Sequence, residues 1–378
     1  MNKNSASIAA GVYAATPHSP FTERRERLLK ELQSRKIQGM VVAKPANVLY
    51  LTGFHGSAGT LIVSGEGPLL LVDPRYTLQA EEQAGGVKVI EARRNQLSAA
   101  GGWLARKRLK QVGFEDTHLS CAEFSVLKGS GARNVVWKNL GGVVESLRAV
   151  KEPGEVERIA QAGRLTAEVF EELLQKVKPG VREVELAAEI EFRLRGKGAD
   201  GVAFETIVAS GFRGAYPHAR ASNKQLKAGE LVIFDLGAIL SGYAADMTRT
   251  VFLGKPPSRV SALYRAVLEA QQAGVSALKA GKAANSVDKA VRKTLTTHNL
   301  DQFFTHSTGH GVGLEIHESP RLARVEKARL QAGQVVTVEP GIYIEGLGGI
   351  RIEDTLAIST DGVRNLTPAS KDNWILNS

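Results

Sequence analysis

Residues 230–254 read ELVIFDLGAILSGYAADMTRTVFLG, and the interpretation of the whole chain starts from them. An apolar run meets a Ser-Gly turn and returns as a second apolar run, which is the pattern of a β-hairpin. Asp235 and Asp246 interrupt the two runs, although aspartate is a poor strand former and like charges across a sheet are destabilising. A local rule broken in both strands indicates a functional site.

The position of the turn decides how close the two carboxylates come. If the turn centres between Leu240 and Ser241, Asp235 and Asp246 are direct cross-strand neighbours. A register two residues away makes them diagonal neighbours, which still lets them share a cation. The alternative is an ion pair with Arg249, which cannot easily serve both aspartates in an apolar setting.

A second pair of carboxylates lies in residues 334–359, QVVTVEPGIYIEGLGGIRIEDTLAIS. Glu339 ends one apolar run, and Glu353 follows the glycine-rich turn in the next. Arg351 stands two positions before Glu353, on the same face of a regular strand. We expect Arg351 to orient Glu353 as a ligand, and the alternative is that Arg351 is its only partner.

Four carboxylates in one pocket require cations, and two divalent ions would neutralise them. Residues 306–318, HSTGHGVGLEIHE, add three of the chain's eight histidines, namely His306, His310 and His317. The interleaved glycines argue against a helix, since each costs about 1 kcal/mol there. We expect an extended segment in which one histidine is a ligand and the others lie nearby for catalysis. This oxygen-rich donor set suits Mn²⁺, with Co²⁺ and Zn²⁺ also possible.

Composition limits the class of protein. The 378 residues carry a net charge of +10, and the first 150 hold 20 Lys+Arg against 12 Asp+Glu. No nucleic-acid motif accompanies this excess, so we interpret it as solvated helix surface and expect no nucleic-acid partner. Cys121 is the single cysteine, which favours a reducing, cytoplasmic compartment. No apolar run approaches the ~18 residues of a membrane span, so no membrane partner is expected.

The chain is predicted to have a flexible tail (1–20), a first domain (21–150) and a second domain (151–378), with Pro153 and Gly154 in VKEPGE breaking regular structure at the boundary. Strands alternating with helices predict an α/β first domain. Its strands are expected at 39–43, 47–53, 59–64, 68–73, 87–92 and 134–139. In the second domain, two helices lead to a strand pair twice: helices at 155–177 and 183–198 precede the pair near 230–253, and helices at 259–280 and 284–298 precede the pair near 334–358.

These segments resemble the creatinase/aminopeptidase P/prolidase family of metallopeptidases over nearly the whole chain. FDLGAILSGYAADMTRTV, HSTGHGVGLEIHE, VEPGIYI and GGIRIEDT match its metal-ligand motifs in order, and YLTGFHGSAGTLIVS and DPRYTLQAEEQ are similar to the amino-terminal domain of its Xaa-Pro branch. The resemblance implies an α/β (α+β) protein, with a creatinase-like α/β domain followed by a pita-bread metallopeptidase domain. A homodimer is expected on the same ground.

The resemblance also assigns roles to residues. Asp235 would bind one of two divalent ions, His310 and Glu339 the other, and Asp246 and Glu353 would bridge both. His317 would stabilise the tetrahedral intermediate, His218 would approach the substrate, His306 would contribute to the proline pocket, and Glu339 would shuttle a proton. Two departures from the family pattern are Ser307, where glycine is frequent, and Ala219-Arg220 after His218. Arg220 would grip a substrate carboxylate or point to solvent.

The implied activity is release of the N-terminal residue from Xaa-Pro peptides, as in aminopeptidase P. The alternative is a prolidase that cleaves only Xaa-Pro dipeptides. A non-catalytic binding protein and a metal-free, creatinase-like amidinohydrolase are more remote, because all five ligand positions are filled.

Overall fold

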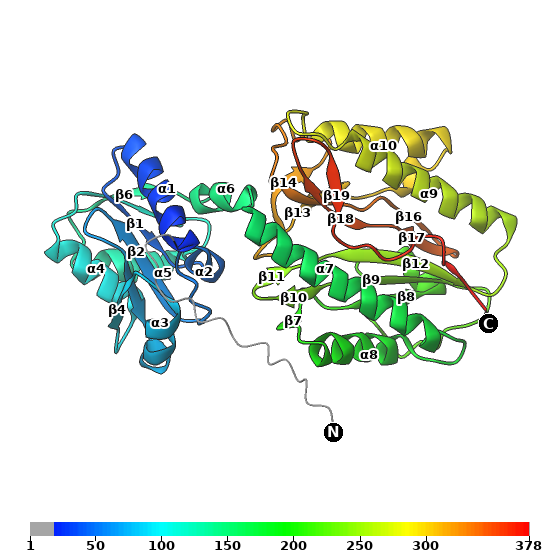
Figure 1. The fold of residues 1–378 in the computed structure, drawn as a ribbon, viewed down its shortest axis with the longest axis horizontal. Helices are drawn as coiled ribbons and strands as arrows, with labels where there is room; N and C mark the ends of the chain where they lie inside the picture. Colours follow the sequence, from blue (N-terminus) through cyan, green and yellow to red (C-terminus); the bar gives the residue numbers. More distant parts are fainter. Residues whose placement is uncertain (1–18, 378) are drawn as a thin grey trace, which may run out of the picture. The chain divides into compact units, whose positions relative to one another are not determined.

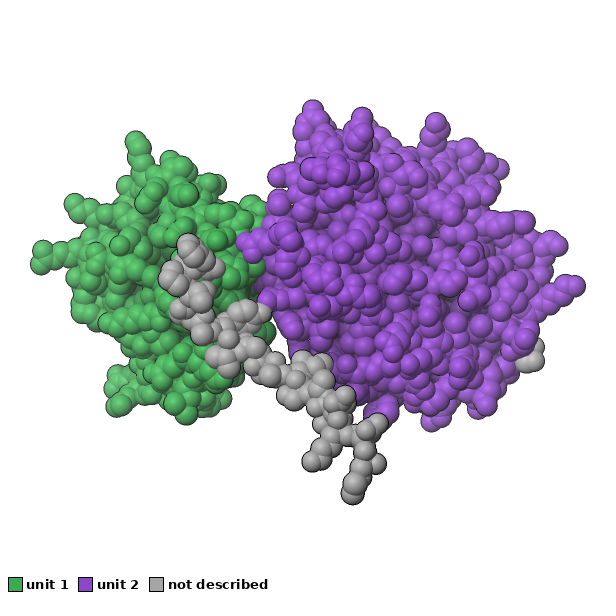
Figure 2. Space-filling model, in the orientation of Figure 1, with its two compact units in different colours: residues 1–148 green, residues 149–378 purple. Residues whose placement is uncertain are grey.

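The computed structural model describes residues 19–377 and divides into two compact units, the first ending at Arg148 and the second beginning at Ala149 (Figure 2). Most of the predicted tail lies outside the described residues, and helix α1 begins at Pro20, the last residue assigned to that tail. Among the described residues, no helix combines the length and apolarity needed to cross a membrane.

The first unit is a six-stranded mixed sheet with helices (Figure 1). The strand order is β4-β3-β2-β1-β5-β6, with parallel pairing of β1 to β5, β5 to β6 and β3 to β4. Its elements are α1 (Pro20–Ser34), β1 (Gly39–Val42), α2 (Pro45–Thr52), β2 (Gly59–Ser64), β3 (Leu69–Val72), η1 (Pro74–Tyr76), α3 (Thr77–Gln83), β4 (Lys88–Glu91), α4 (Gln96–Arg106), β5 (Gln111–Phe114), α5 (Cys121–Gly129) and β6 (Val136–Asn139), and α6 (Val143–Ala149) ends the unit.

The strand predicted at 47–53 is wrong, because this segment forms helix α2. Pro45 occupies the first turn, where its missing N–H costs nothing. Gly53 ends the helix in the left-handed conformation (φ 83°) and donates its N–H to the Leu49 carbonyl. These two end signals prevail over the β-branched and aromatic composition between them.

The second unit contains two similar halves, as the repeated order of elements predicted. The first half has α7 (Pro153–Leu173), η2 (Leu174–Lys176), α8 (Glu183–Gly196), β7 (Gly201–Val202), β8 (Ile207–Ser210), η3 (Gly211–Ala215), β9 (Leu231–Leu236), β10 (Ala238–Leu240), β11 (Tyr243–Ala244) and β12 (Met247–Leu253). The second half has α9 (Ser258–Ala277), α10 (Asn285–Thr297), η4 (Asp301–Phe303), β13 (Gly309–Gly311), β14 (Glu318–Leu322), β15 (Val335–Val338), β16 (Gly341–Ile344), β17 (Gly348–Arg351), β18 (Asp354–Ile358), β19 (Val363–Asn365) and β20 (Ile375–Leu376).

Each half supplies most strands of one sheet, and the pairing is antiparallel except between β12 and β20, which are parallel although β20 comes from the second half. The first has the order β20-β12-β9-β8, the second has the order β14-β13-β15-β18-β19, and β16 pairs with β17. Figure 1 shows α9 and α10 together on one side of these strands and α8 on the opposite side. Apolar residues of both strands and helices fill the two interiors. The strand ends that carry the predicted ligands are thereby held in a packed core.

The observed register of the hairpin does not pair the two aspartates directly. Asp235 lies opposite Thr248, so Asp246 is its diagonal neighbour, which is the second of the two registers considered. The turn residues are Ser241 (φ 51°) and Gly242 (φ 79°). Positive φ at both positions is the two-residue hairpin turn that matches strand twist. The turn therefore centres one residue later than Leu240-Ser241, and Asp246 lies in the gap between β11 and β12.

Candidate metal centre

The five predicted ligands lie at strand ends or within short strands of the second unit. Asp235 is in β9, Asp246 directly precedes β12, and His310 is the middle residue of β13. Glu339 directly follows β15, and Glu353 lies between β17 and β18. The first half thus supplies two carboxylates, and the second half supplies two more together with the imidazole.

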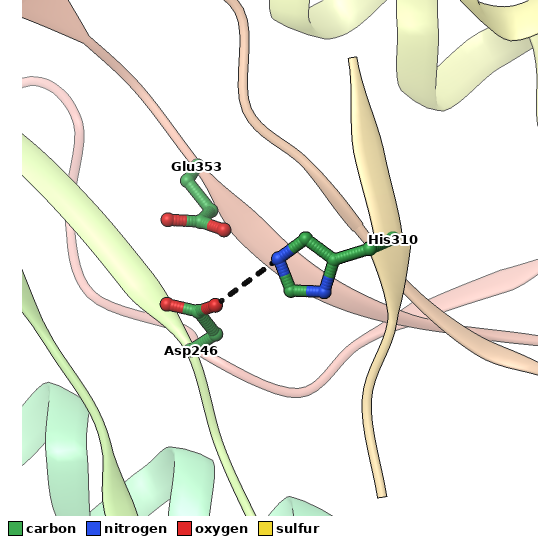
Figure 3. A group of neighbouring side chains, drawn as sticks. All are labelled: Asp246, His310 and Glu353. Carbon is green, nitrogen blue, oxygen red and sulfur yellow. Dashed lines mark ion pairs between the residues drawn. The ribbon is translucent and has the colours of Figure 1, made fainter. Parts of the chain in front are cut away.

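Three of the five side chains converge closely. Asp246, His310 and Glu353 each offer a ligand atom, and these atoms lie within 4.8 Å of one another. Figure 3 shows the three side chains pointing toward one another from separate segments. His310 Nε2 lies 3.5 Å from Asp246 Oδ2 and 3.5 Å from Glu339 Oε1, so Glu339 adjoins the same centre.

The glycines around His310 are required by close backbone packing. A Cβ on Gly309 would collide with the carbonyl oxygen of Thr337, and a Cβ on Gly311 would collide with that of Ser319. The short strand β13 therefore fits between β15 and β14 only with glycine on both sides of His310. The extended conformation predicted for the histidine segment is confirmed at Gly309–Gly311, whereas residues 313–317 form bends.

Asp235 joins the centre through a different partner. Its Oδ2 accepts a hydrogen bond from Arg351 Nη2 at 2.6 Å, while its Oδ1 is buried without a hydrogen-bond partner among residues 19–377. Arg351 also donates to Tyr343 Oη at 2.8 Å. The expectation that Arg351 orients Glu353 is wrong. Because β17 ends at Arg351, residues 351 and 353 do not share the face of one regular strand.

Glu353 is held by a residue that the sequence interpretation missed. Thr248 Oγ1 donates to Glu353 Oε2 at 2.6 Å, and Glu353 Oε1 is buried without a hydrogen-bond partner in the described chain. Thr248 is two positions after Asp246, so the period of a strand could have pointed to it. Arg249 pairs with Asp354 at 2.8 Å, so the alternative ion pair with Asp235 or Asp246 is also wrong.

Hydrogen bonds across the two halves form a seam, which we define as residues 248–250 of β12 together with residues 351–354. Glu353 N donates to Thr248 O at 3.1 Å, and Arg351 N donates to Thr250 Oγ1 at 3.0 Å. The buried Arg249 side chain crosses the same seam to Asp354. The seam fixes the two bridging candidates, Asp246 and Glu353, relative to each other.

The electrostatics of the site call for positive charge. Burial raises the pKa of Asp246 well above its usual range, and the neighbouring Asp235 and Glu339 raise it further. Burial followed by the charges of Asp246 and Glu339 does the same for the pKa of Glu353. Burial also raises the pKa of Glu339. Without a cation, these groups gain by holding protons in place of charge.

His310 is prepared to be a ligand through Nε2. Its Nδ1 lies 3.0 Å from the Gly311 carbonyl oxygen, which can only accept, so Nδ1 carries the proton. Burial lowers the pKa of His310, which keeps the imidazole neutral. The Nε2 lone pair then faces Asp246 and Glu339. This backbone-oriented tautomer is the usual arrangement of a metal-binding histidine.

The donor set fits divalent cations. Two buried carboxylate oxygens lack partners in the described chain, namely Asp235 Oδ1 and Glu353 Oε1. A neutral imidazole nitrogen and two further carboxylates with raised pKa values adjoin them. A bound cation would supply the missing partners and favour ionisation of the carboxylates.

The remaining predicted histidines surround this centre. His317 is exposed, with its ring centroid 4.4 Å from that of His310. His306 Nε2 lies 2.8 Å from Tyr343 Oη, and its Nδ1 lies 4.0 Å from Glu339 Oε2. His218 is exposed. Burial lowers the pKa of both His306 and His317, and the neighbouring His218 contributes to the lowering of both. Arg220 is exposed and pairs with Glu205 at 3.0 Å, so it points to solvent.

Comparison with known proteins agrees with this geometry. The profile described as metallopeptidase family M24 matches residues 157–360, and the creatinase/prolidase N-terminal domain profile matches residues 24–150. A Xaa-Pro dipeptidase of Pyrococcus furiosus is 35% identical over 353 residues, which cover 93% of this chain and 99% of that protein.

Solved structures with the same fold include two bacterial enzymes. A Xaa-Pro dipeptidase from Bacillus anthracis superposes with a TM-score of 0.91 at 36% identity, covering 94% of this chain and 100% of that one. An X-Pro aminopeptidase from Thermotoga maritima has a TM-score of 0.86 at 34% identity, covering 94% and 100%.

The fold and the carboxylate-histidine centre define a metal-dependent hydrolase. The chain belongs to metallopeptidase family M24 and carries the creatinase/prolidase N-terminal domain. The predicted family, two-part fold class and metallopeptidase activity are thereby confirmed. Family membership implies divalent metal ions, and the centre described above is the candidate site for them.

Proposed function

We propose that this chain is a Xaa-Pro dipeptidase, a prolidase that cleaves the bond before proline in dipeptides. The proposal is supported by the relative from P. furiosus and the structure from B. anthracis, both named as Xaa-Pro dipeptidases and both matched over more than nine-tenths of this chain. These relatives favour the dipeptidase alternative over the aminopeptidase P activity predicted from the sequence. The T. maritima structure makes X-Pro aminopeptidase activity the second candidate.

Asp235, Asp246, His310, Glu339 and Glu353 are proposed to hold two divalent ions, with Mn²⁺ the proposed metal because oxygen ligands dominate. When bound, such ions supply a nucleophile by lowering the pKa of water and polarise the scissile carbonyl. The homodimer and the cytoplasmic compartment stay predictions.

Residues of the chain itself supply binding and proton transfer. His317 and His218, both exposed, are proposed to donate to substrate carbonyl oxygens, and the His317 ring lies 4.4 Å from that of His310 between centroids. Glu339 lies between His306 and His310, at 4.0 and 3.5 Å. We propose that Glu339 shuttles a proton to the proline nitrogen as that nitrogen leaves.

Substrate length tests the proposed activity. We expect hydrolysis of Xaa-Pro dipeptides with kcat/KM at least about 10-fold above that of matched Xaa-Pro-Yaa tripeptides, a difference of roughly 1.4 kcal/mol in transition-state binding. Steady-state kinetics on one pair with the same first residue, at fixed Mn²⁺ concentration, gives the ratio. Faster cleavage of the tripeptide would favour the aminopeptidase, and cleavage of neither would reject both.

Two histidine substitutions separate ligand from substrate contact. His310→Ala is expected to lower metal content, because it removes the nitrogen that faces Asp246 and Glu339. His317→Ala is expected to retain metal and to lose roughly 10²–10³ in kcat, the range for one oxyanion donor. Elemental analysis and kinetics of both variants make the comparison. Equal metal loss in the two variants would contradict the role of His317.

A further inference from the structure

The segment that carries His218 is a closed loop, residues 211–221, which we call the His218 segment. It begins directly after Ser210, the last residue of β8, and ends directly before Ser222. It includes the short helix η3, while His218 itself lies beyond η3 and is exposed. An exposed loop of this length is mobile unless something holds it. Its restraints therefore determine where His218 stands.

Both ends of the His218 segment converge on one carboxylate, that of Glu183. Glu183 Oε1 accepts hydrogen bonds from Ser210 N at 2.7 Å and Ser210 Oγ at 2.8 Å. Its Oε2 accepts from Ser222 N at 3.1 Å, Ser222 Oγ at 2.6 Å and Arg213 Nε at 2.9 Å. The Glu183 side chain is fully buried, with 0% of its surface exposed. One carboxylate thus receives five donors from the start, the interior and the end of the loop.

The backbone of helix α8 strengthens the same closure. Glu183 N donates to Lys224 O, and Val184 N donates to Ser222 O, both at 3.0 Å. These are N–H groups of the first helical turn, which have no partner within the helix. Arg213 links the interior of the loop to its far end, since its Nη2 donates to Arg220 O at 2.5 Å.

On its other side, the His218 segment packs backbone to backbone against β17. A Cβ on Gly214 would lie 2.9 Å from Gly349 N, and a Cβ on Gly349 would collide with Gly214 O. Arg351, which holds Asp235, also donates from Nη1 to Pro217 O at 3.2 Å. The residue directly before His218 is thereby tied to the metal centre. Glu183 thus holds the two ends of the loop, while β17 and Arg351 hold its middle.

We propose that Glu183 is a positioning residue, which sets the distance of His218 from the metal centre by closing the His218 segment at both ends. The proposal rests on the proposed function, since it takes His218 to contact the substrate. Glu183 itself does not touch the centre and acts through the loop. A purely structural role would lower stability without a selective effect on the His218 step, so the two roles have different experimental signatures.

Glu183→Gln tests the hydrogen bonds of this carboxylate, because glutamine has nearly the same shape as glutamate. The side-chain amide nitrogen of the glutamine is itself a donor, and it would face backbone or guanidinium N–H groups that also donate. One of the two sets of hydrogen bonds to residue 183 would therefore be lost. We expect kcat/KM on a Xaa-Pro dipeptide to fall about 100-fold, the effect of roughly 1 Å of misplacement. Metal content should match wild type, because none of the five ligands changes.

Limited trypsin digestion gives a readout that does not depend on activity. The His218 segment contains Arg213 and Arg220, and a loosened loop exposes both bonds to protease. We expect cleavage after these residues to be several-fold faster in Glu183→Gln than in wild type. If the wild-type enzyme cleaved no Xaa-Pro substrate, the proposed function would fail, while this digestion would still report whether Glu183 holds the loop.

The matched control is Glu115→Gln in the first unit. Glu115 is 1% exposed and accepts hydrogen bonds from Ala43 N, Lys44 N and Asn47 Nδ2 at 2.6 to 2.8 Å. It therefore has a comparable structural role away from His218, and its loss should lower the unfolding midpoint but leave kcat/KM unchanged. An equal loss of kcat/KM in both variants would overturn the positioning role.

A double-mutant cycle ties the effect to His218. If Glu183 acts through His218, Glu183→Gln adds nothing to the loss already caused by His218→Ala, and the double variant equals His218→Ala alone. Fully additive losses would overturn the proposal, as would Glu183→Gln with wild-type kinetics and wild-type digestion. Should Glu183→Gln fail to fold, Ser222→Ala removes the hydroxyl that donates to Glu183 at 2.6 Å and accepts from Lys224 N at 3.1 Å. The same non-additivity with His218→Ala is then expected at smaller amplitude.

Discussion

Asp246→Ala is expected to abolish hydrolysis of Xaa-Pro dipeptides and to lower metal content. Asp246 lies beside His310 and Glu353 and is a candidate ligand for both ions. Loss of a single preorganised electrostatic contact costs up to about 10³-fold in rate, and removal of a ligand proposed to serve both ions should exceed that. Kinetics at saturating Mn²⁺ and elemental analysis of the purified variant measure the two effects. Activity within a few-fold of wild type would disprove the metal centre at this hairpin.

The fold of the Asp246→Ala variant should survive. Burial raises the pKa of Asp246, and the neighbouring Asp235 and Glu339 raise it further, so its removal relieves the metal-free site of an unfavourably buried carboxyl group. Asp200→Ala is the matched control. Asp200 is exposed and accepts from the N–H of Gly242 in the turn of the same hairpin, at 2.9 Å, outside the centre. Its loss should leave activity and metal content near wild type.

Removal of metal should silence the enzyme, and added Mn²⁺ or Co²⁺ should restore it. One buried carboxylate oxygen each of Asp235 and Glu353 has no hydrogen-bond partner among the described residues. A bound ion would coordinate these oxygens. Metal that binds only the folded chain stabilises it by about 2.7 kcal/mol when free metal is about 100 times Kd. Full activity in protein shown by elemental analysis to be metal-free would contradict the proposed chemistry.

Metal removal should also change the pH dependence of stability. The raised pKa values of Asp246, Glu339 and Glu353 mean that the folded metal-free chain binds more protons than the unfolded chain above about pH 4. Their contribution to the free energy of unfolding therefore falls as pH rises through the raised values.

The histidines of the site act in the opposite direction over a lower pH range. The lowered pKa values of His306, His310 and His317 mean that the unfolded chain binds more protons below about pH 6.5. Their contribution rises toward that pH and is constant above it. Above about pH 6.5 the histidines no longer change the free energy of unfolding with pH, so any slope from these groups comes from the carboxylates.

Chemical denaturation of both forms across a pH series compares the two slopes. We expect the chelated protein to lose stability relative to the metal-loaded protein as pH rises, because metal competes with protons for the same ligands. Parallel slopes in the two forms would show that these carboxylates do not control the linkage.

The sequence was sufficient wherever a local rule determined the structure. The two aspartates in apolar runs, the glycines around His310 and the repeated helix-helix-strand order each predicted what is observed. The exact register was less certain, because it depended on which residues adopt positive φ, and Ser241 is an unusual residue for that role. The segment 47–53 was misassigned since its composition favours a strand, whereas Pro45 and Gly53 define a helix.

Partners from distant segments could not be predicted in the same way. Arg351 stands two residues from Glu353, yet it binds Asp235 at 2.6 Å, 116 positions away in sequence. Thr248 binds Glu353, 105 positions away. Both contacts cross between the halves of the second unit, and their geometry is fixed by how two sheets pack. A pattern within one strand contains no information about that packing.

The seam has a consequence for how the second unit can be divided. The two halves look like independent modules because each has two helices and its own sheet. Arg249, however, is 1% exposed in one half and depends on Asp354, 2% exposed, in the other. Removing one partner of a buried ion pair typically costs about 3–5 kcal/mol, a large part of the stability of a small domain. A cut of the chain between β12 and α9 would therefore give fragments that recover their structure only by reassociating, so these halves are poor candidates for separate expression or for exchange with another protein.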